Sequence, residues 1–161
     1  MEFIRLAKIK NLPLVCTLQN SYSLINRIVE LGMTEIFFRE KLSFFSYSPL
    51  GFGHLSGKYL KDPKAVGRVN LFPGYAQRYN KSGVKKAIEK YDALAAKRNV
   101  SLTDLALSFV YSQWFVTSTV IGATNMNQLK QNIAAYGLDI VDEELIQEID
   151  AIHLDVMNPA P

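Results

Sequence analysis

Three short segments of the sequence carry side chains and turns that are suited to holding a nucleotide. Gln19 offers a carboxamide that can both donate and accept hydrogen bonds, which suits it to pairing with another amide. Residues 47–53 combine the aromatic face of Tyr47 with a glycine-rich turn whose backbone N–H groups can bind a phosphate. Residues 122–124 lead into a predicted helix, whose N-terminus attracts anions. Together these segments predict a nucleotide ligand with an amide-bearing aromatic ring at one end.

Each of these features also has a purely structural explanation. A glutamine at the end of a strand commonly pairs with a turn, Tyr47 could belong to the core, and Thr124 could only cap the helix that follows it. Lys58 adds a compact positive charge a few residues beyond the glycine turn, suited to the same phosphate. One segment alone favours the structural explanation, and only the three together favour a ligand.

Short apolar runs that alternate with helical patterns predict an α/β fold with parallel strands. Strands buried on both faces are predicted at residues 14–18, 42–47 and 116–121. Helices are predicted at residues 1–10, 21–32, 33–41, 81–98, 101–114, 125–134 and from 142 onward. Each strand runs into one of the three ligand-suited segments. Ligands of such sheets bind beyond the carboxyl ends of the strands, so the segments should meet there.

The long stretch at residues 48–80 is rich in glycine and proline and shows no regular period. We therefore expect a long loop there, and loops of this length inside a compact domain are usually functional or mobile.

Composition narrows the classes of function. The chain has 161 residues, which fits one domain, and its charge of +3 is spread rather than clustered, which argues against nucleic-acid binding. No apolar run is long enough to span a membrane, and no signal peptide is expected. The single cysteine, Cys16, is predicted to be a small buried side chain, and no metal-ligand spacing occurs. A cytoplasmic location is expected.

Three sequence segments carry a family resemblance. The stretches TLQNSYSLINR, SYSPLGFGHLSGKYL and VIGATNMNQLKQNI resemble the last three strand–loop units of the aldo/keto reductases, above all the bacterial Tas-like branch, which is also similar to potassium-channel β-subunits. The resemblance covers about residues 3–161. It implies a partial (β/α)8 barrel with parallel strands, and a parent reaction in which NADPH reduces an aldehyde or ketone.

The resemblance also implies a role for each ligand-suited residue. Gln19 would bind the nicotinamide carboxamide, and Tyr47 would stack on the nicotinamide ring. The pyrophosphate would be neutralised by Lys58 and lined by Ser48, Pro49, Leu50, Gly51 and Gly53.

The adenosine end of the cofactor would bind further along the chain. Arg68 would reach the adenosine, and Asn132 would contact the adenine. The 2′-phosphate and ribose would be held by Gly122, Thr124 and Gln128. Two departures concern this end: Gln131 replaces a common glutamate, and Gln128 stands where some members have an arginine. A missing cation weakens the expected preference for NADP over NAD.

Length is the larger departure from the family. The family barrel needs roughly 250 residues and eight strands, whereas the predicted strands here are equivalent to the sixth, seventh and eighth. We therefore expect residues 1–161 to be the C-terminal part of the domain, truncated at its N-terminus. The family's catalytic Asp, Tyr, Lys and His would lie in the missing part. No catalytic residue is assigned, and His54 and His153 are expected to be solvated or capping.

Two functions follow as expectations. The isolated chain would retain the NADP(H)-binding loops and be inactive, because hydride transfer to a carbonyl needs a proton donor. Alternatively it would be half of a split oxidoreductase, made active by a separate polypeptide with the missing strands. Open edges of buried parallel strands invite association, so we expect self-association, pairing with such a half, or poor folding.

Overall fold

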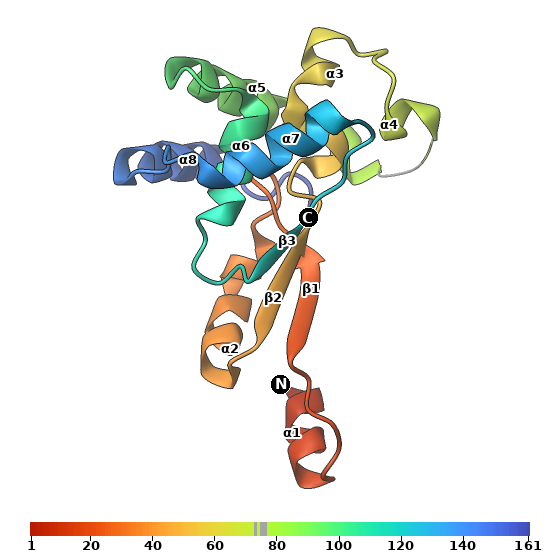
Figure 1. Ribbon diagram of the computed structural model, residues 1–161, viewed down its shortest axis with the longest axis vertical. Coiled ribbons are helices and arrows are strands. Elements are labelled where there is room, and N and C mark those ends of the chain that lie inside the picture. Colours follow the sequence, from red (N-terminus) through yellow and green to blue (C-terminus); the bar gives the residue numbers. More distant parts are fainter. Residues whose placement is uncertain (73, 75–76) are drawn as a thin grey trace.

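The computed structural model describes residues 1–72, 74 and 77–161. Its centre is one sheet of three parallel strands in the order β1-β2-β3, with β1 at Thr17–Ser21, β2 at Ser43–Tyr47 and β3 at Ser118–Val120. The predicted α/β class and parallel strands are confirmed. Figure 1 shows that the strands run toward the end of the molecule that holds helices α3 to α8, while α1 lies at the opposite end.

The predicted position of the first strand is wrong by three residues. The ladder with β2 runs from the pair Thr17 and Ser43 to the pair Ser21 and Tyr47. The apolar residues just before it are exposed, and Cys16 is also exposed, contrary to its predicted burial. Pairing with β2 therefore sets the strand, and the apolar run does not. As a result, Gln19 lies inside β1 and not in a loop after it.

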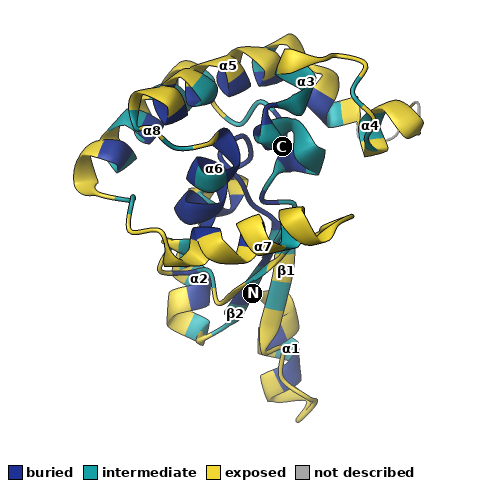
Figure 2. Ribbon diagram, turned by 45° about the horizontal axis from the view of Figure 1, so that its top comes forward, coloured by how far each residue is buried: buried dark blue, intermediate teal, exposed yellow. Residues whose placement is uncertain are grey.

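The two faces of the sheet differ in what covers them. Side chains alternate between the faces of a strand. Phe44 and Ser46 are fully buried against the helices. On the other face Phe45 and Tyr47 are half-buried, and Gln19 is exposed. This second face, which would line the inside of a barrel, is open in the described part of the chain (Figure 2).

The helices pack on the buried face around α6 (Leu102–Tyr111). Eight of its ten residues are buried, because its sequence is apolar on all sides. The amphipathic helices α5 (Ser82–Lys97) and α8 (Glu143–Asp155) turn one apolar side inward. The remaining elements on this side are α2 (Met33–Glu40), α7 (Met126–Ala134) and the short 3-10 helix η4 (Ala135–Gly137).

Polar side chains cap helix starts. The Ser101 side chain accepts a hydrogen bond from the Asp104 backbone N–H at the start of α6. Asp142 caps α8 in the same way, accepting from the Leu145 N–H at 2.6 Å. These caps satisfy backbone donors that the first turn of a helix leaves without partners.

The helix predicted at residues 21–32 is wrong for most of its length. Only η1 (Ile28–Leu31) is helical, as a 3-10 turn. Residues 22–27 are all buried, whereas an amphipathic helix would leave one side exposed to water. Instead Ser23 and Asn26 exchange backbone hydrogen bonds of 3.0 Å, and the Asn26 amide donates to the Ser21 hydroxyl. Tertiary packing overrides the helical pattern here.

Arg27 anchors this segment to the rest of the molecule. Its guanidinium is buried and donates to Glu30 and, at 2.7 Å, to Asp150 of α8. Its backbone N–H donates to the Asn158 side chain, so the C-terminal tail is held as well. Ala160 N–H completes the attachment by donating to the Ile25 carbonyl.

The stretch predicted as a loop at residues 48–80 contains four short helical turns. They are η2 (Gly51–Ser56), α3 (Lys58–Lys61), α4 (Arg68–Leu71) and η3 (Gln77–Asn80). The part of the prediction at residues 73, 75 and 76 lies outside the described residues.

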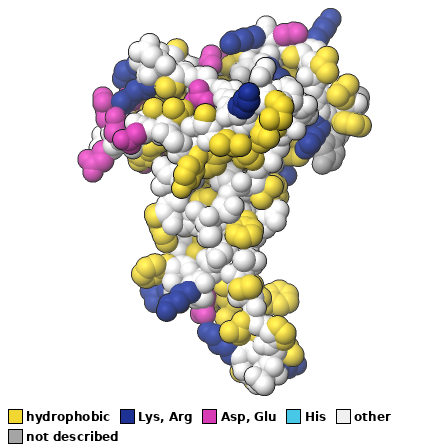
Figure 3. All heavy atoms as spheres, in the orientation of Figure 1, with side chains coloured by type: hydrophobic (Ala, Val, Ile, Leu, Met, Phe, Trp, Pro, Cys, Tyr) yellow, Lys and Arg dark blue, Asp and Glu magenta, His cyan; other side chains and the backbone are white. Residues whose placement is uncertain are grey.

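Helix α1 (Glu2–Ile9) stands apart from the helical layer. An ion pair of 2.8 Å between Lys8 and Glu40 joins it to α2. Phe3 is 82% exposed, and Leu12 and Leu14 after the helix are also exposed. Figure 3 shows hydrophobic side chains on the surface around this end of the molecule. This end therefore presents apolar surface to water.

Candidate functional site

Gln19 and Tyr47 lie on the same, open face of the sheet. Gln19 pairs with Phe45 in the ladder, and Tyr47 is two residues beyond Phe45, so the three side chains point to one side. Tyr47 in turn pairs with Val120 of β3. The structure thus places an amide and an aromatic ring on one surface, next to the carboxyl ends of all three strands.

The glycine turn after β2 has an unusual backbone. Ser48, Gly51, Phe52 and Gly53 all have left-handed conformations, with φ between 51° and 88°. Two backbone hydrogen bonds of 2.9 Å close the turn, from the Gly51 N–H to Ser48 and from the Gly53 N–H to Leu50. Turns that mix right- and left-handed residues form concave anion sites. The turn predicted to line a pyrophosphate therefore has a suitable shape.

Gly51 also has a structural reason to be glycine. A Cβ atom there would lie 2.8 Å from Ile25 Cδ1, which is closer than such atoms approach. Both Gly51 and Pro49 are buried. These two residues shape the turn, and the contacts of a ligand would fall to its half-buried residues, Ser48, Leu50 and Gly53.

Two cations of the described chain stand beside the turn without a carboxylate partner. Lys58 Nζ lies over the Tyr59 ring and donates to the Val66 carbonyl at 3.3 Å. Arg68 lies with its guanidinium 5.4 Å from the centre of the Phe52 ring. Among the described residues neither cation forms an ion pair. The donors and charges here fit a phosphate group.

Gly67 allows the Lys58 amine to take this position. A Cβ on Gly67 would lie 2.4 Å from Lys58 Nζ and 2.2 Å from the Tyr59 hydroxyl. The backbone of Gly67 is extended, so a side chain there would not strain the backbone but would displace the ends of the Lys58 and Tyr59 side chains. Sequence reasoning missed this residue, although it precedes Arg68 directly.

The predicted adenosine end gathers at the start of α7. Asn125 caps the helix, and the Gln128 carboxamide oxygen accepts hydrogen bonds from both the N–H and the hydroxyl of Thr124, at 2.9 and 3.0 Å. A phosphate bound to Thr124 would have to replace this neutral acceptor. Gln128 occupies the position where some family members have an arginine, so this position brings no positive charge to the phosphate.

Asn132 has a clear structural role. It is buried, and its amide donates to the Gly122 carbonyl at 3.1 Å, which holds the turn between β3 and α7. A Cβ added to Gly122 would meet no described atom within 4 Å, so space is open beside this residue. The predicted contact of Asn132 with adenine would have to use the part of the Asn132 amide that does not bind the Gly122 carbonyl.

Sequence reasoning also missed Tyr79, which belongs to η3. Its ring is 3% exposed and lies against the glycine turn, 5.3 Å from the Phe52 ring centre. Burial raises the pKa of Tyr79, and so does the nearby Tyr47, while Arg78 and a hydrogen bond with Ser48 oppose the rise. No sequence pattern marks Tyr79, because it stands in an irregular stretch.

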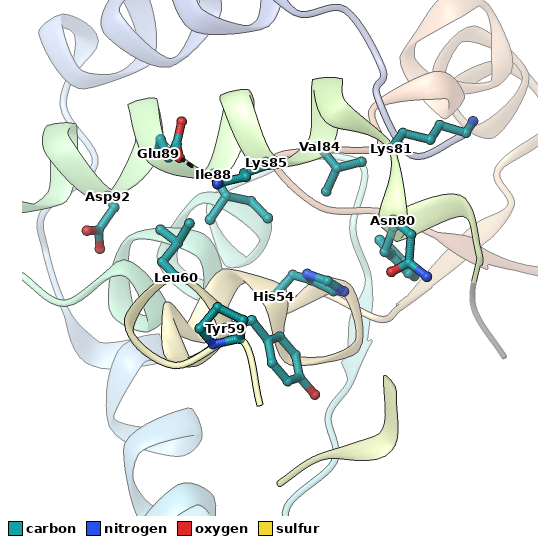
Figure 4. Close-up of a pocket in the computed structure, with 12 residues that line it drawn as sticks. His54, Tyr59, Leu60, Asn80, Lys81, Val84, Lys85, Ile88, Glu89 and Asp92 are labelled. Carbon is teal, nitrogen blue, oxygen red and sulfur yellow. Dashed lines mark ion pairs between the residues drawn. The ribbon is translucent and has the colours of Figure 1, made fainter. Parts of the chain in front are cut away.

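A cavity of about 580 Å³ lies behind the glycine turn, between α3 and α5. Val84 and Ile88 of α5 point into it toward His54 and Leu60, as Figure 4 shows. His54 is half-buried, so the sequence-based expectation of a solvated side chain is met only in part. Its Nε2 is buried without a hydrogen-bond partner among the described residues, and burial, with the nearby Lys58 charge, lowers the pKa of His54.

His153 is half-buried as well. Its Nδ1 is buried without a partner in the described part of the chain. Burial lowers the pKa of His153, with the Arg27 charge adding to the effect. Within the described residues, no group of three His, Cys, Asp or Glu side chains could hold a metal, and no helix is long and apolar enough to cross a membrane.

Comparison with known proteins gives consistent matches. The model of the aldo/keto reductase family matches residues 2–153. Protein tas of Escherichia coli (strain K12) is 40% identical over 161 residues, which cover 100% of this chain and 46% of that protein. An aldo-keto reductase of Babesia bovis is 35% identical over 99% of this chain and 58% of its own length. An L-glyceraldehyde 3-phosphate reductase of Escherichia coli O157:H7 is 29% identical over 80% of this chain and 39% of its own length.

The chain thus spans about half the length of the curated relatives it matches. The predicted Tas-like resemblance is confirmed by the 40% identity over the whole chain. The chain therefore belongs to the aldo/keto reductase family.

Proposed function

We propose that these 161 residues form the NADP(H)-binding part of a carbonyl-reducing aldo/keto reductase, equivalent to its last three strand–helix units. The observation that carries the proposal is the pair of cations, Lys58 and Arg68, which stand beside the glycine turn without a carboxylate partner among the described residues. The turn lies on the same strand-end edge as Tyr47, and Gln19 lies on the same sheet face as Tyr47. Family membership adds support, since such reductases bind this cofactor.

The residues divide the binding task by their chemistry. When bound, a reduced nicotinamide supplies hydride to a carbonyl carbon. Gln19 would hold the ring carboxamide, because its own amide can both donate and accept. Tyr47 would stack on one face of the ring and keep water from it. The turn and Lys58 would neutralise the pyrophosphate, and Thr124 would bind the 2′-phosphate after releasing Gln128.

We propose further that the isolated chain does not reduce carbonyls. A proton must reach the carbonyl oxygen as hydride arrives, and no residue here corresponds to the family's proton-donating tyrosine. The most deeply buried tyrosines do not substitute for it. Tyr22 and Tyr91 lie in the helical core, where burial raises the pKa of each above its usual value.

The alternative is a split oxidoreductase. A separate polypeptide carrying the remaining strands would cover the open face of the sheet and pair with the outer edges of β1 and β3. The exposed surface on that face and around α1 supports an association of this kind, and self-association would use the same edges. A cytoplasmic location stays a prediction.

A titration separates these possibilities. The 161-residue chain is titrated with NADPH while nicotinamide fluorescence is followed, and NADH is run in parallel to show what the 2′-phosphate contributes. Saturable binding of NADPH supports the proposal, and no binding at high protein concentration contradicts it. Turnover of a reactive aldehyde is then assayed with and without a polypeptide carrying the first five strands. Turnover by the chain alone refutes the proposed inactivity, and turnover only with the added polypeptide supports the split enzyme.

A further inference from the structure

Tyr79 connects the two ends of the long segment between β2 and α5. That segment opens with the glycine turn at Ser48 and closes with η3, which contains Tyr79. A Cβ on Gly51 would lie 3.4 Å from Tyr79 Cε1, so the ring sits directly on the turn backbone. The Tyr79 ring also stacks on His54, with ring centres 5.4 Å apart and an interplanar angle of 27°.

One side chain therefore packs on the turn and on the residue that follows it. The Tyr79 ring lies against Gly51, Phe52 and His54. The ring is 3% exposed, and the Arg78 guanidinium covers it at 5.5 Å. Within η3, all of which is described, no other residue is buried.

The turn needs such a support because its backbone is strained. Ser48 and Phe52 have φ values of 56° and 57°, and a left-handed conformation costs a non-glycine residue about 1–2 kcal/mol. Strained conformations persist only where surrounding packing holds them. Among the described contacts, the Tyr79 ring packs on the ring of Phe52, one of the two left-handed non-glycine residues of the turn.

We propose that Tyr79 is a positioning residue for the pyrophosphate of the cofactor. The proposal rests on the proposed function, since it assigns Tyr79 to the same site. The Tyr79 ring holds the left-handed turn in the shape that presents its backbone to the phosphates. Its described contacts lie on the glycine turn and not at the α7 end of the site, so it acts on one half of the ligand.

Two ligands distinguish this role from a general effect on folding. NADPH spans the whole site, whereas 2′-AMP carries the 2′-phosphorylated adenosine end without either phosphate of the pyrophosphate. The Kd of each is measured for the wild-type chain and for Tyr79→Phe, Tyr79→Leu and Tyr79→Ala. Tyr136→Ala is the control, because Tyr136 is 77% exposed. Thermal unfolding by circular dichroism shows that each variant is folded at the titration temperature.

The proposal predicts that Tyr79→Phe rescues binding, because it keeps the ring. Tyr79→Ala weakens NADPH binding about tenfold or more, which corresponds to about 1.4 kcal/mol, and leaves the Kd for 2′-AMP unchanged. Tyr79→Leu, which keeps apolar bulk without a flat ring, falls between them and serves if the alanine variant does not fold. Equal NADPH affinity in all variants overturns the role, and so does an equal loss for both ligands. If the wild-type chain binds neither ligand, the proposed function itself is wrong.

Discussion

Replacing Lys58 by methionine removes the cation beside the glycine turn and keeps most of the side-chain volume. A charge-assisted hydrogen bond contributes about 1.5–3 kcal/mol, and each 1.4 kcal/mol changes Kd about tenfold. The Kd for NADPH should therefore rise about 10- to 150-fold. The fold should hardly change, because no ion pair between described residues is lost. The hydrogen bond to Val66 and the contact with the Tyr59 ring disappear, and a cation–π contact at an exposed site contributes about 0.5–1 kcal/mol.

The assay is a fluorescence titration with NADPH at low and high salt, together with urea unfolding of each variant. Lys61→Met is the matched control, since Lys61 is an exposed lysine on the same short helix α3. Wild type and Lys61→Met should lose affinity as salt rises, and Lys58→Met should lose less because one phosphate contact is already gone. The reasoning is refuted if Lys58→Met binds NADPH as tightly as Lys61→Met.

Four further substitutions test the fold that holds the site. Gly51→Ala should lower the free energy of unfolding by about 1–2 kcal/mol in urea, because φ of Gly51 is positive and Ile25 blocks the new Cβ. Gly122→Ala is the control, because its new Cβ enters open space, and it should change the free energy of unfolding by less than about 0.5 kcal/mol. Arg27→Met leaves the carboxylates of Glu30 and Asp150 without their cation and should lower the free energy of unfolding by about 2–3 kcal/mol. The loss is smaller than for a fully buried ion pair because both carboxylates reach water. An unchanged urea midpoint would show that these ion pairs do not stabilise the fold. The pKa of His54 is lowered in the folded state, so the unfolded chain binds more protons and stability should fall as pH drops below about 6.5. His54→Gln should remove part of that loss, as measured by thermal unfolding between about pH 5 and 7.5, and an unchanged pH slope would show that His54 does not cause it.

The sequence predicts best those helices whose apolar residues form a clear stripe or a long run with a recognisable start. Helix α5 shows an apolar stripe and α6 an apolar run with a capping serine, and both form close to their predicted bounds. The segment after β1 misleads because residues 22–27 are buried on all sides, so apolar residues recur without a helix. The shift of β1 has a related cause, since the partner strand and not the apolar run selects the paired residues.

The residues of the candidate site also fall into those that local sequence predicts and those that it does not. Residues that contribute a turn or a charge near a strand end, such as Lys58 and Gly53, can be predicted from local sequence because topology brings strand ends together. Tyr79 and Gly67 cannot, because each acts through a contact with a residue far along the chain or around a loop. The partial burial of His54 escapes prediction for the same reason, since the Tyr79 ring that stacks on it lies far along the chain from its own segment.

The most direct test of the cofactor site is a map of backbone amide shifts in the 161-residue chain, recorded by NMR as NADP⁺ is added. The account predicts that the shifts concentrate on the strand-end edge, at Gln19, at residues 47–58 and at residues 122–128, and that they saturate together. Shifts confined to the cavity between α3 and α5, or no shifts at high NADP⁺ concentration, would contradict it.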